Sequence, residues 1–190
     1  MTKLPFFGGA RLASWLPAIV LSSASPALAA PHPSGTLHLS GYYSGTIVLP
    51  AAVDDNPACM WAKGFSALNN NAAVQLSFGA VKLAVNGHRE TMPGFQVTFA
   101  LGKFGYTEPV QDIVRDNPTK ATAGITYAPK GDLTGIATGA SGSVSTSANG
   151  ASGSVHAAFA RVKDFQVIPG TTTVSGSWNG CSHAPSYATI

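Results

Sequence analysis

Charged residues are scarce in this 190-residue sequence, and their scarcity narrows the range of partners. Lys, Arg, Asp and Glu make up 10% of the chain, whereas about 25% is usual for a soluble domain. No run of Lys or Arg occurs in it. Because nucleic acids and anionic membranes attract clusters of basic side chains, we expect neither to be a partner.

Metal-ligand and phosphate-binding patterns are also missing. The sequence has two cysteines, Cys59 and Cys181, and contains no Cys-x-x-Cys pair, no His-Glu-x-x-His motif and no phosphate-binding glycine loop. Because a protein zinc site needs three or four ligands, we expect no metal and no cofactor. The turns "VDDNP" and "RDNP" leave calcium binding open, although ordinary Asx turns explain them more simply.

The sequence also lacks the usual motifs of catalytic sites. No Gly-x-Ser-x-Gly elbow occurs, and the five histidines lie in no recognisable pattern with an acid or a serine. Glu90 and Glu108 are the only glutamates. Glycoside hydrolysis by paired carboxylates stays open, because the two acids can come from different strands. We expect a protein that is not an enzyme.

The N-terminal segment has the pattern of a secretory signal. Lys3 and Arg11 precede the apolar run "LASWLPAIVL", and Ala27-Leu28-Ala29 offers a cleavage site. The apolar run is shorter than the roughly 20 residues that span a bilayer, although an uncleaved anchor is the alternative. We expect a signal peptide over residues 1–29 and one domain over residues 30–190, secreted or periplasmic, with no stable membrane insertion after cleavage.

Cleavage also changes the charge of the working protein. It removes two of the eleven basic residues and none of the eight acidic ones, which lowers the formal net charge from +3 to +1. In the oxidising compartment that export implies, Cys59 and Cys181 are expected to form one disulfide, with two free buried thiols as the alternative.

The remaining residues alternate between apolar and polar, with frequent glycine and proline, which is typical of an all-β fold. In "GFQVTFALGKF", for example, Phe95, Val97, Phe99 and Leu101 share one face. In "AVQLSFGAVKLAVNG", Gly79 marks a bend or bulge and Asn86-Gly87 a turn. About eight to ten such segments predict a single antiparallel β-sandwich, immunoglobulin-like or related.

One stretch departs from this rhythm. Residues 103–132 hold eight of the seventeen charged residues of the expected mature chain. Within them "PVQDIVRD" has the pattern of a short helix that begins near Pro109 and ends before Pro118. We interpret the stretch as a charged loop insertion, which is either a functional loop or a solvated connection.

The segment "SGSVSTSANGASGSVHAAFA", residues 141–160, has the composition of a flexible linker. A two-residue type I′ turn at Asn149-Gly150 would nevertheless place Val144 opposite Val155. Such symmetry predicts a hairpin within the domain. A longer turn from Ala148 to Gly153 is the alternative, and it would shift the pairing.

Tyrosines supply the binding hypothesis. Tyr42 and Tyr43 are adjacent on an expected strand and point to opposite faces, so one ring is expected to meet solvent. Tyr106 and Tyr127 flank the charged insertion and offer a second patch. We take these four tyrosines as candidate ligand-binding residues, with a protein or a glycan as the partner.

The order of the signal, "SGTLHLSG", "SGTIVLP", the first cysteine, "ANGASGSVHAAF" and "TTTVSGSWNGC" resembles small exported bacterial β-sandwich proteins of unknown function. The resemblance implies a fold and an extracytoplasmic location and carries over no catalytic residue. We therefore expect a non-enzymatic protein with an envelope-associated or extracellular binding role. A carbohydrate-binding module that uses the tyrosines is the alternative.

Overall fold

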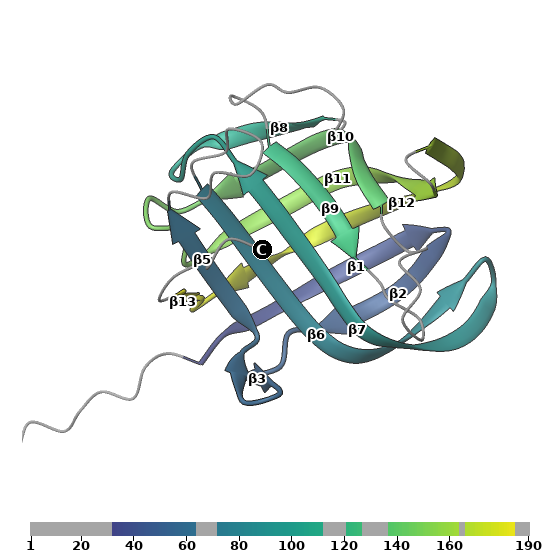
Figure 1. Cartoon of the computed structure of the whole chain (residues 1–190), viewed down its shortest axis with the longest axis horizontal. Coiled ribbons are helices and arrows are strands. Elements are labelled where there is room, and N and C mark those ends of the chain that lie inside the picture. The colour runs from purple at the N-terminus through teal and green to yellow at the C-terminus, as the bar shows by residue number, and fades with distance from the viewer. Residues whose placement is uncertain (1–31, 64–71, 112–120, 127–136, 164–165, 185–190) are drawn as a thin grey trace, which may run out of the picture. The chain divides into compact units, whose positions relative to one another are not determined.

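The computed structural model describes residues 32–63, 72–111, 121–126, 137–163 and 166–184, all of them within one compact unit, Pro31–Ile190 (Figure 1). Every regular element among these residues is a β-strand. The prediction of an all-β fold is therefore confirmed. The predicted signal peptide and its cleavage site lie outside the described residues, so they stay predictions.

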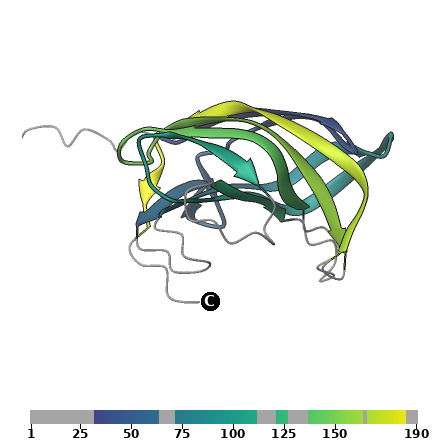
Figure 2. The same ribbon diagram turned by 90° about the horizontal axis from the view of Figure 1, so that it is seen from above.

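Eleven strands join in one sheet, and eight of them pair in a closed ring in which each strand is antiparallel to both neighbours. In ring order, which is also chain order, the strands are β1 (Ser34–Gly41), β2 (Tyr43–Val48), β6 (Ala72–Val85), β7 (His88–Leu101), β9 (Ala121–Thr126), β10 (Ala137–Thr146), β11 (Gly153–Lys163) and β12 (Gln166–Asn179). The ring closes where β12 pairs with β1. Figure 2 shows the consequence, because the green and yellow strands arch over the blue and teal ones.

The other strands attach to this ring or lie beside it. Strand β5 (Cys59–Lys63) extends the sheet from β6, and β13 (Ser182–His183) lies parallel to β5. Strand β8 (Thr107–Gln111) pairs antiparallel with β10 and parallel with β9. Strands β3 (Ala52–Val53) and β4 (Asn56–Pro57) form a separate hairpin.

These pairings correct the predicted architecture. The expected sheet was purely antiparallel, which is wrong, because two of the pairs are parallel. Apart from the β3–β4 hairpin, the described strands form one curled sheet, so the two packed sheets of a sandwich are not confirmed. Alternation along a strand shows which side is buried, and that pattern is the same whether two sheets face each other or one sheet closes on itself.

The hydrophobic core lies inside the ring. The predicted inward face of β7 is confirmed, since Phe95, Val97 and Phe99 are fully buried and Leu101 is nearly so. On β6 the buried positions also alternate, and the register shifts around Gly79, where a bulge was predicted. Side chains from strands all around the ring meet in one hydrophobic cluster, so the interior of the ring is filled by a packed core.

The predicted helix near Pro109 is wrong for the residues that the structure describes. Thr107–Gln111 form strand β8, in which Glu108 and Val110 are buried while Thr107 and Pro109 are exposed. Pairing of β8 with β10 and β9 outweighs the local helix pattern, because propensity is a weak signal beside tertiary packing. Residues 112–120 lie outside the described part of the chain.

The segment 141–160 is folded, and its predicted register is confirmed. Val144 pairs with Val155, and Thr146 pairs with Gly153. The turn itself differs from type I′, which needs a positive φ at both central residues. Gly150 has a φ of 76° and Asn149 does not have a positive φ. The turn is instead closed by hydrogen bonds from the Gly150 amide to the Ser147 carbonyl and from the Ser147 amide to the Ser152 carbonyl, both 2.9 Å.

Candidate functional site

The disulfide predicted between Cys59 and Cys181 is present. It joins the first residue of β5 to the segment after β12, across a sequence separation of 122 and a Cα–Cα distance of 4.6 Å. Both cysteines are buried. The Cys181 amide also donates to the Ala151 carbonyl (2.9 Å). The bridge and this hydrogen bond hold the segment after β12 against β5 and against the β10–β11 turn.

Aromatic side chains surround the end of the closed strand ring at which the disulfide lies. The Trp61 ring meets His183 edge to face, with centroids 4.3 Å apart, and meets Phe104 at 5.8 Å. Trp178 stacks on Phe99 at 5.2 Å, inside the core cluster that includes the bridged cysteines. Trp61 is half-buried and packs against the same cluster. This end is therefore held by covalent and aromatic contacts together.

The tyrosine pair lies at the turn between β1 and β2. Tyr43 is buried, at 4% exposure, and its ring meets Tyr42 edge to face at 5.0 Å. The guanidinium carbon of Arg161 lies 3.8 Å from the centroid of the Tyr42 ring. Arg161 also donates from Nη1 to the Pro169 carbonyl (2.9 Å), which holds the guanidinium in place. One face of Tyr42 is thus covered by a cation–π contact, and Tyr43 belongs to the core.

Tyr106 is the more open candidate. It is 54% exposed, and the Lys103 ammonium lies 3.7 Å from its ring centroid. The loop that carries it is held by the buried Glu108 carboxylate, whose Oε2 and Oε1 accept the amides of Gly102 (2.9 Å) and Lys103 (3.0 Å). Such charge-assisted bonds hold the backbone of the loop that leads to Tyr106.

The structure does not bring the tyrosines together. Tyr106 accepts a backbone hydrogen bond from Thr146 at one end of β10, whereas the Tyr42 ring meets Arg161, which pairs with Ala137 at the other end of β10. Tyr127 lies outside the described residues. Binding through the four tyrosines therefore stays a prediction, and on the described residues it would involve two separate places.

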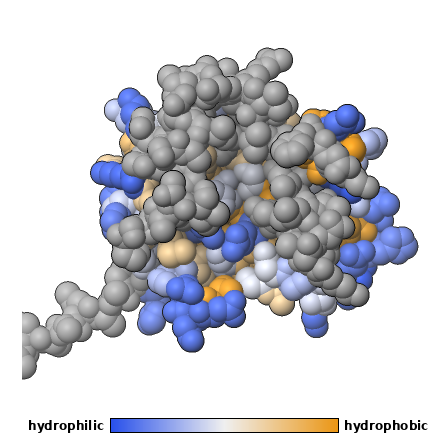
Figure 3. All heavy atoms as spheres, in the orientation of Figure 1, coloured by the Kyte–Doolittle hydropathy of each residue, from blue (hydrophilic) through white to orange (hydrophobic). Residues whose placement is uncertain are grey.

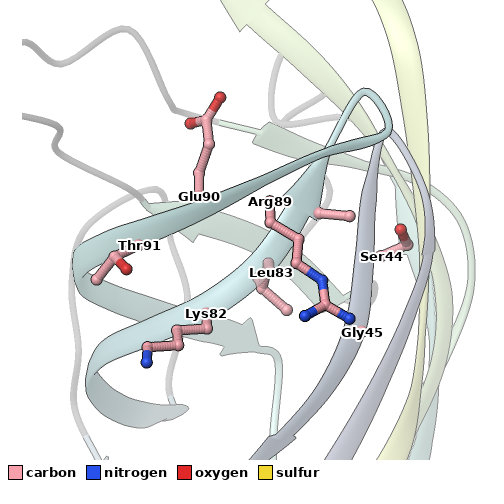
Figure 4. Close-up of a pocket in the computed structure, with 8 residues that line it drawn as sticks. Ser44, Gly45, Lys82, Leu83, Arg89, Glu90 and Thr91 are labelled. Carbon is pink, nitrogen blue, oxygen red and sulfur yellow. The ribbon is translucent and has the colours of Figure 1, made fainter.

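A hollow that sequence reasoning missed lies between β2 and the β6–β7 hairpin, with residues from both faces of the hairpin in its lining (Figure 4). It has a volume of about 480 Å³ and is lined by Ser44, Gly45, Lys82, Leu83, Ala84, Arg89, Glu90 and Thr91. Lys82 precedes the Asn86-Gly87 turn and Arg89 follows it. A hairpin with this predicted turn pairs Ala84 with Arg89 and Lys82 with Thr91, so the turn and the alternation along the two strands could have indicated that the two cations share a face.

The described residues show neither a metal-binding cluster nor a membrane-spanning helix. No group of three or more His, Cys, Asp and Glu side chains gathers there in a way that could hold a metal ion. In the same part of the chain, no helix has the length and apolar character needed to cross a membrane.

Comparison of this chain with protein-family models, with curated proteins and with solved structures finds no match.

Proposed function

We propose that this protein is a non-enzymatic binding protein that works outside the cytoplasm, either secreted or in the periplasm, in association with the envelope or the extracellular space. The observation that carries the proposal is the buried Cys59–Cys181 disulfide. Such bridges persist in oxidising compartments and are rare where thiols are kept reduced. The secretory pattern of residues 1–29 points to the same location.

Packing of the ring supports a binding role on its outer surface. Large side chains such as Phe95, Phe99 and Phe159 are fully buried within it, so a ligand would meet the outer faces and the loops. On the coloured part of the face in Figure 3, hydrophobic residues lie in small groups among hydrophilic ones. A surface of this mixed kind suits a polar ligand better than a broad apolar one.

Localisation tests the proposal directly. The full chain would be expressed in a bacterial host, followed by separation of cytoplasm, periplasm and medium and by thiol alkylation before and after reduction. We expect the protein in the periplasm or the medium, with thiols that react only after reduction. A cytoplasmic protein whose thiols react at once would overturn the proposal. A Cys59→Ser/Cys181→Ser variant serves as the control for the alkylation signal.

Carbohydrate binding is the second candidate, and the exposure of Tyr106 favours it. An aromatic ring with one open face can stack on a sugar, and the Lys103 ammonium next to the ring adds a hydrogen-bond donor. A glycan array would be probed with the wild type, Tyr106→Ala and Tyr42→Ala. Signals lost in Tyr106→Ala alone would support the candidate, and silence of the wild type on every glycan would remove it.

A further inference from the structure

Strand β2 separates from β6 at a defined point, and the hollow lies at that point (Figure 4). The β2–β6 ladder has only two pairs, Tyr43 with Val85 and Ser44 with Ala84. Beyond them β2 continues beside β1 to Val48, while β6 continues beside β7. The hollow is therefore a consequence of the strand pairing and is framed by regular backbone on both sides.

The register of the hairpin directs two cations to the outer side of this hollow. Ala84 pairs with Arg89, and Lys82 pairs with Thr91, so the four residues form two neighbouring rows on one face. Leu83, between the two rows, is buried on the inner side. Lys82 and Arg89 are thus held at diagonal positions on the outer face of a regular hairpin. Their side chains extend in different directions in Figure 4, and the flexible four-carbon stem of Lys82 would have to turn to meet a ligand held by Arg89.

Small residues leave room beside Arg89. Ala84, which pairs with Arg89, fills little of the hollow, and Gly45 lies on the facing strand. Gly45 has a φ of 145°, which disfavours a larger residue there, and a Cβ at this position would point toward the buried Leu83 side chain, 2.8 Å from its Cδ2 atom. In Figure 4 the Arg89 side chain extends toward Gly45 across this space.

Glu90 also lines the hollow, but its carboxylate is turned away from the two cations (Figure 4). Glu90 pairs with Leu83 and so belongs to the other face of the hairpin. Within the part of the chain that the structure describes, neither cation has an ion-pair or hydrogen-bond partner. Arg161 and Lys103, in contrast, each lie over a tyrosine ring.

We propose that this hollow, hereafter the Lys82–Arg89 hollow, binds an oxyanion, namely a carboxylate or phosphate group of a small ligand or a saccharide. Arg89 can donate two parallel hydrogen bonds to such a group, and Lys82 adds a point charge. The Ser44 and Thr91 hydroxyls supply further donors. The inference rests on the binding role proposed above and names its ligand class.

The test is a titration of the exported, purified protein followed by ¹H–¹⁵N correlation spectra. The probes are inorganic phosphate and glucuronate, with glucose as the neutral counterpart of glucuronate. We expect saturable shifts of the Gly45, Ala84 and Arg89 amides with at least one anion and none with glucose. Phosphate alone would identify phosphate groups as the ligand, and glucuronate alone would identify acidic sugars.

Variants separate a built site from general attraction of anions. Arg89→Gln and Lys82→Gln each remove a charge-assisted contact, so each should weaken binding by about tenfold or more. Arg89→Lys keeps the charge and should lose less. Lys63→Gln, at the exposed last residue of β5, removes the same charge away from the hollow and should change nothing. Because these side chains are exposed, the variants should fold like the wild type.

Three results would overturn the inference, and the first two concern the hollow itself. They are the absence of saturable shifts with both anions and equal weakening by Lys63→Gln and Arg89→Gln. Neither result bears on the localisation experiment. A protein that is exported and oxidised but binds no oxyanion would refute this inference and leave the proposed function standing. Shifts that map to the Tyr106 loop instead are the third result and would also refute this inference.

Discussion

Trp178 has a glycine beside it on both neighbouring strands, Gly35 on β1 and Gly153 on β11. A side chain at Gly153 would overlap the Trp178 indole ring and the Ser145 carbonyl oxygen. The missing Cβ atoms let the indole lie close to the sheet and stack on Phe99. These glycines are therefore packing positions within regular strands.

Replacement of Gly153 by alanine tests this interpretation. The added methyl group must displace the Trp178 ring or the backbone of β10, so we expect Gly153→Ala to lower the free energy of unfolding by about 1–3 kcal/mol. Urea unfolding followed by tryptophan fluorescence measures the change. Ser154→Ala, at the exposed next position, should stay within about 0.5 kcal/mol of the wild type. Equal midpoints for the two variants would contradict the packing argument.

At the scale of the element, the β10–β11 hairpin shows that composition is a poor guide when the pattern of side chains is specific. Its segment is rich in serine, glycine and alanine, yet Val144 and Val155 face each other across the ladder and are both buried. Strand β11 also pairs with β12 along its whole length. A linker-like sequence is thus fixed in the centre of the sheet.

Amide exchange measures how firmly it is fixed. Strand amides with partners on both sides should exchange only through large openings, so amides of β10 and β11 near Val144 and Val155 should exchange at least about a thousandfold more slowly than those of Ala148 and Asn149. Gly150, whose amide donates to Ser147, should be intermediate. Rapid exchange throughout residues 142–159 would contradict a folded hairpin.

The two Asn-Gly dipeptides at which turns were predicted show how far local sequence predicts structure. At Asn86-Gly87 both residues have positive φ, 49° and 84°, as a type I′ turn requires. At Asn149-Gly150 the same dipeptide forms a different turn, because the Asn149 Oδ1 accepts hydrogen bonds from the Ser147 hydroxyl (2.8 Å) and the Ala151 amide (3.1 Å). Neighbouring polar side chains compete for the backbone there.

Long-range pairing is where the sequence-based predictions stop. The buried face of β7 and the disulfide could be predicted from alternation and from the number of cysteines. The separation of β2 from β6, which creates the Lys82–Arg89 hollow, depends on strands that are about 40 residues apart in the chain. No pattern within a short stretch of sequence predicts where β2 separates from β6. For the same reason the pairing of β12 with β1, and with it the closed ring, was not predicted.

At the scale of the whole molecule, the ring depends on the meeting of its first and last strands, and the disulfide acts close to that junction. Cys181 follows two residues after the end of β12, which pairs with β1 along eight positions. Cys59 begins β5, which lies between β6 and the short edge strand β13. The bridge thereby fixes the end of the last ring strand to another part of the sheet. It also closes the chain between the two cysteines into a loop, which lowers the conformational entropy of the unfolded state.

Loss of the bridge should lower stability without changing the fold. A bridge across about 120 residues stabilises by nearly 5 kcal/mol in the chain-entropy model, and removal of native bridges typically costs about 2–5 kcal/mol. For a domain of this size that range corresponds to a fall in Tm of about 5–15 °C. The Cys59→Ser/Cys181→Ser variant should show this fall, and the wild type should show a similar one after reduction. Because Trp178 shares the core cluster with both cysteines and Trp61 packs against it, tryptophan fluorescence should change as well. An unchanged Tm together with unchanged fluorescence would mean that strand pairing and core packing alone hold the ring closed.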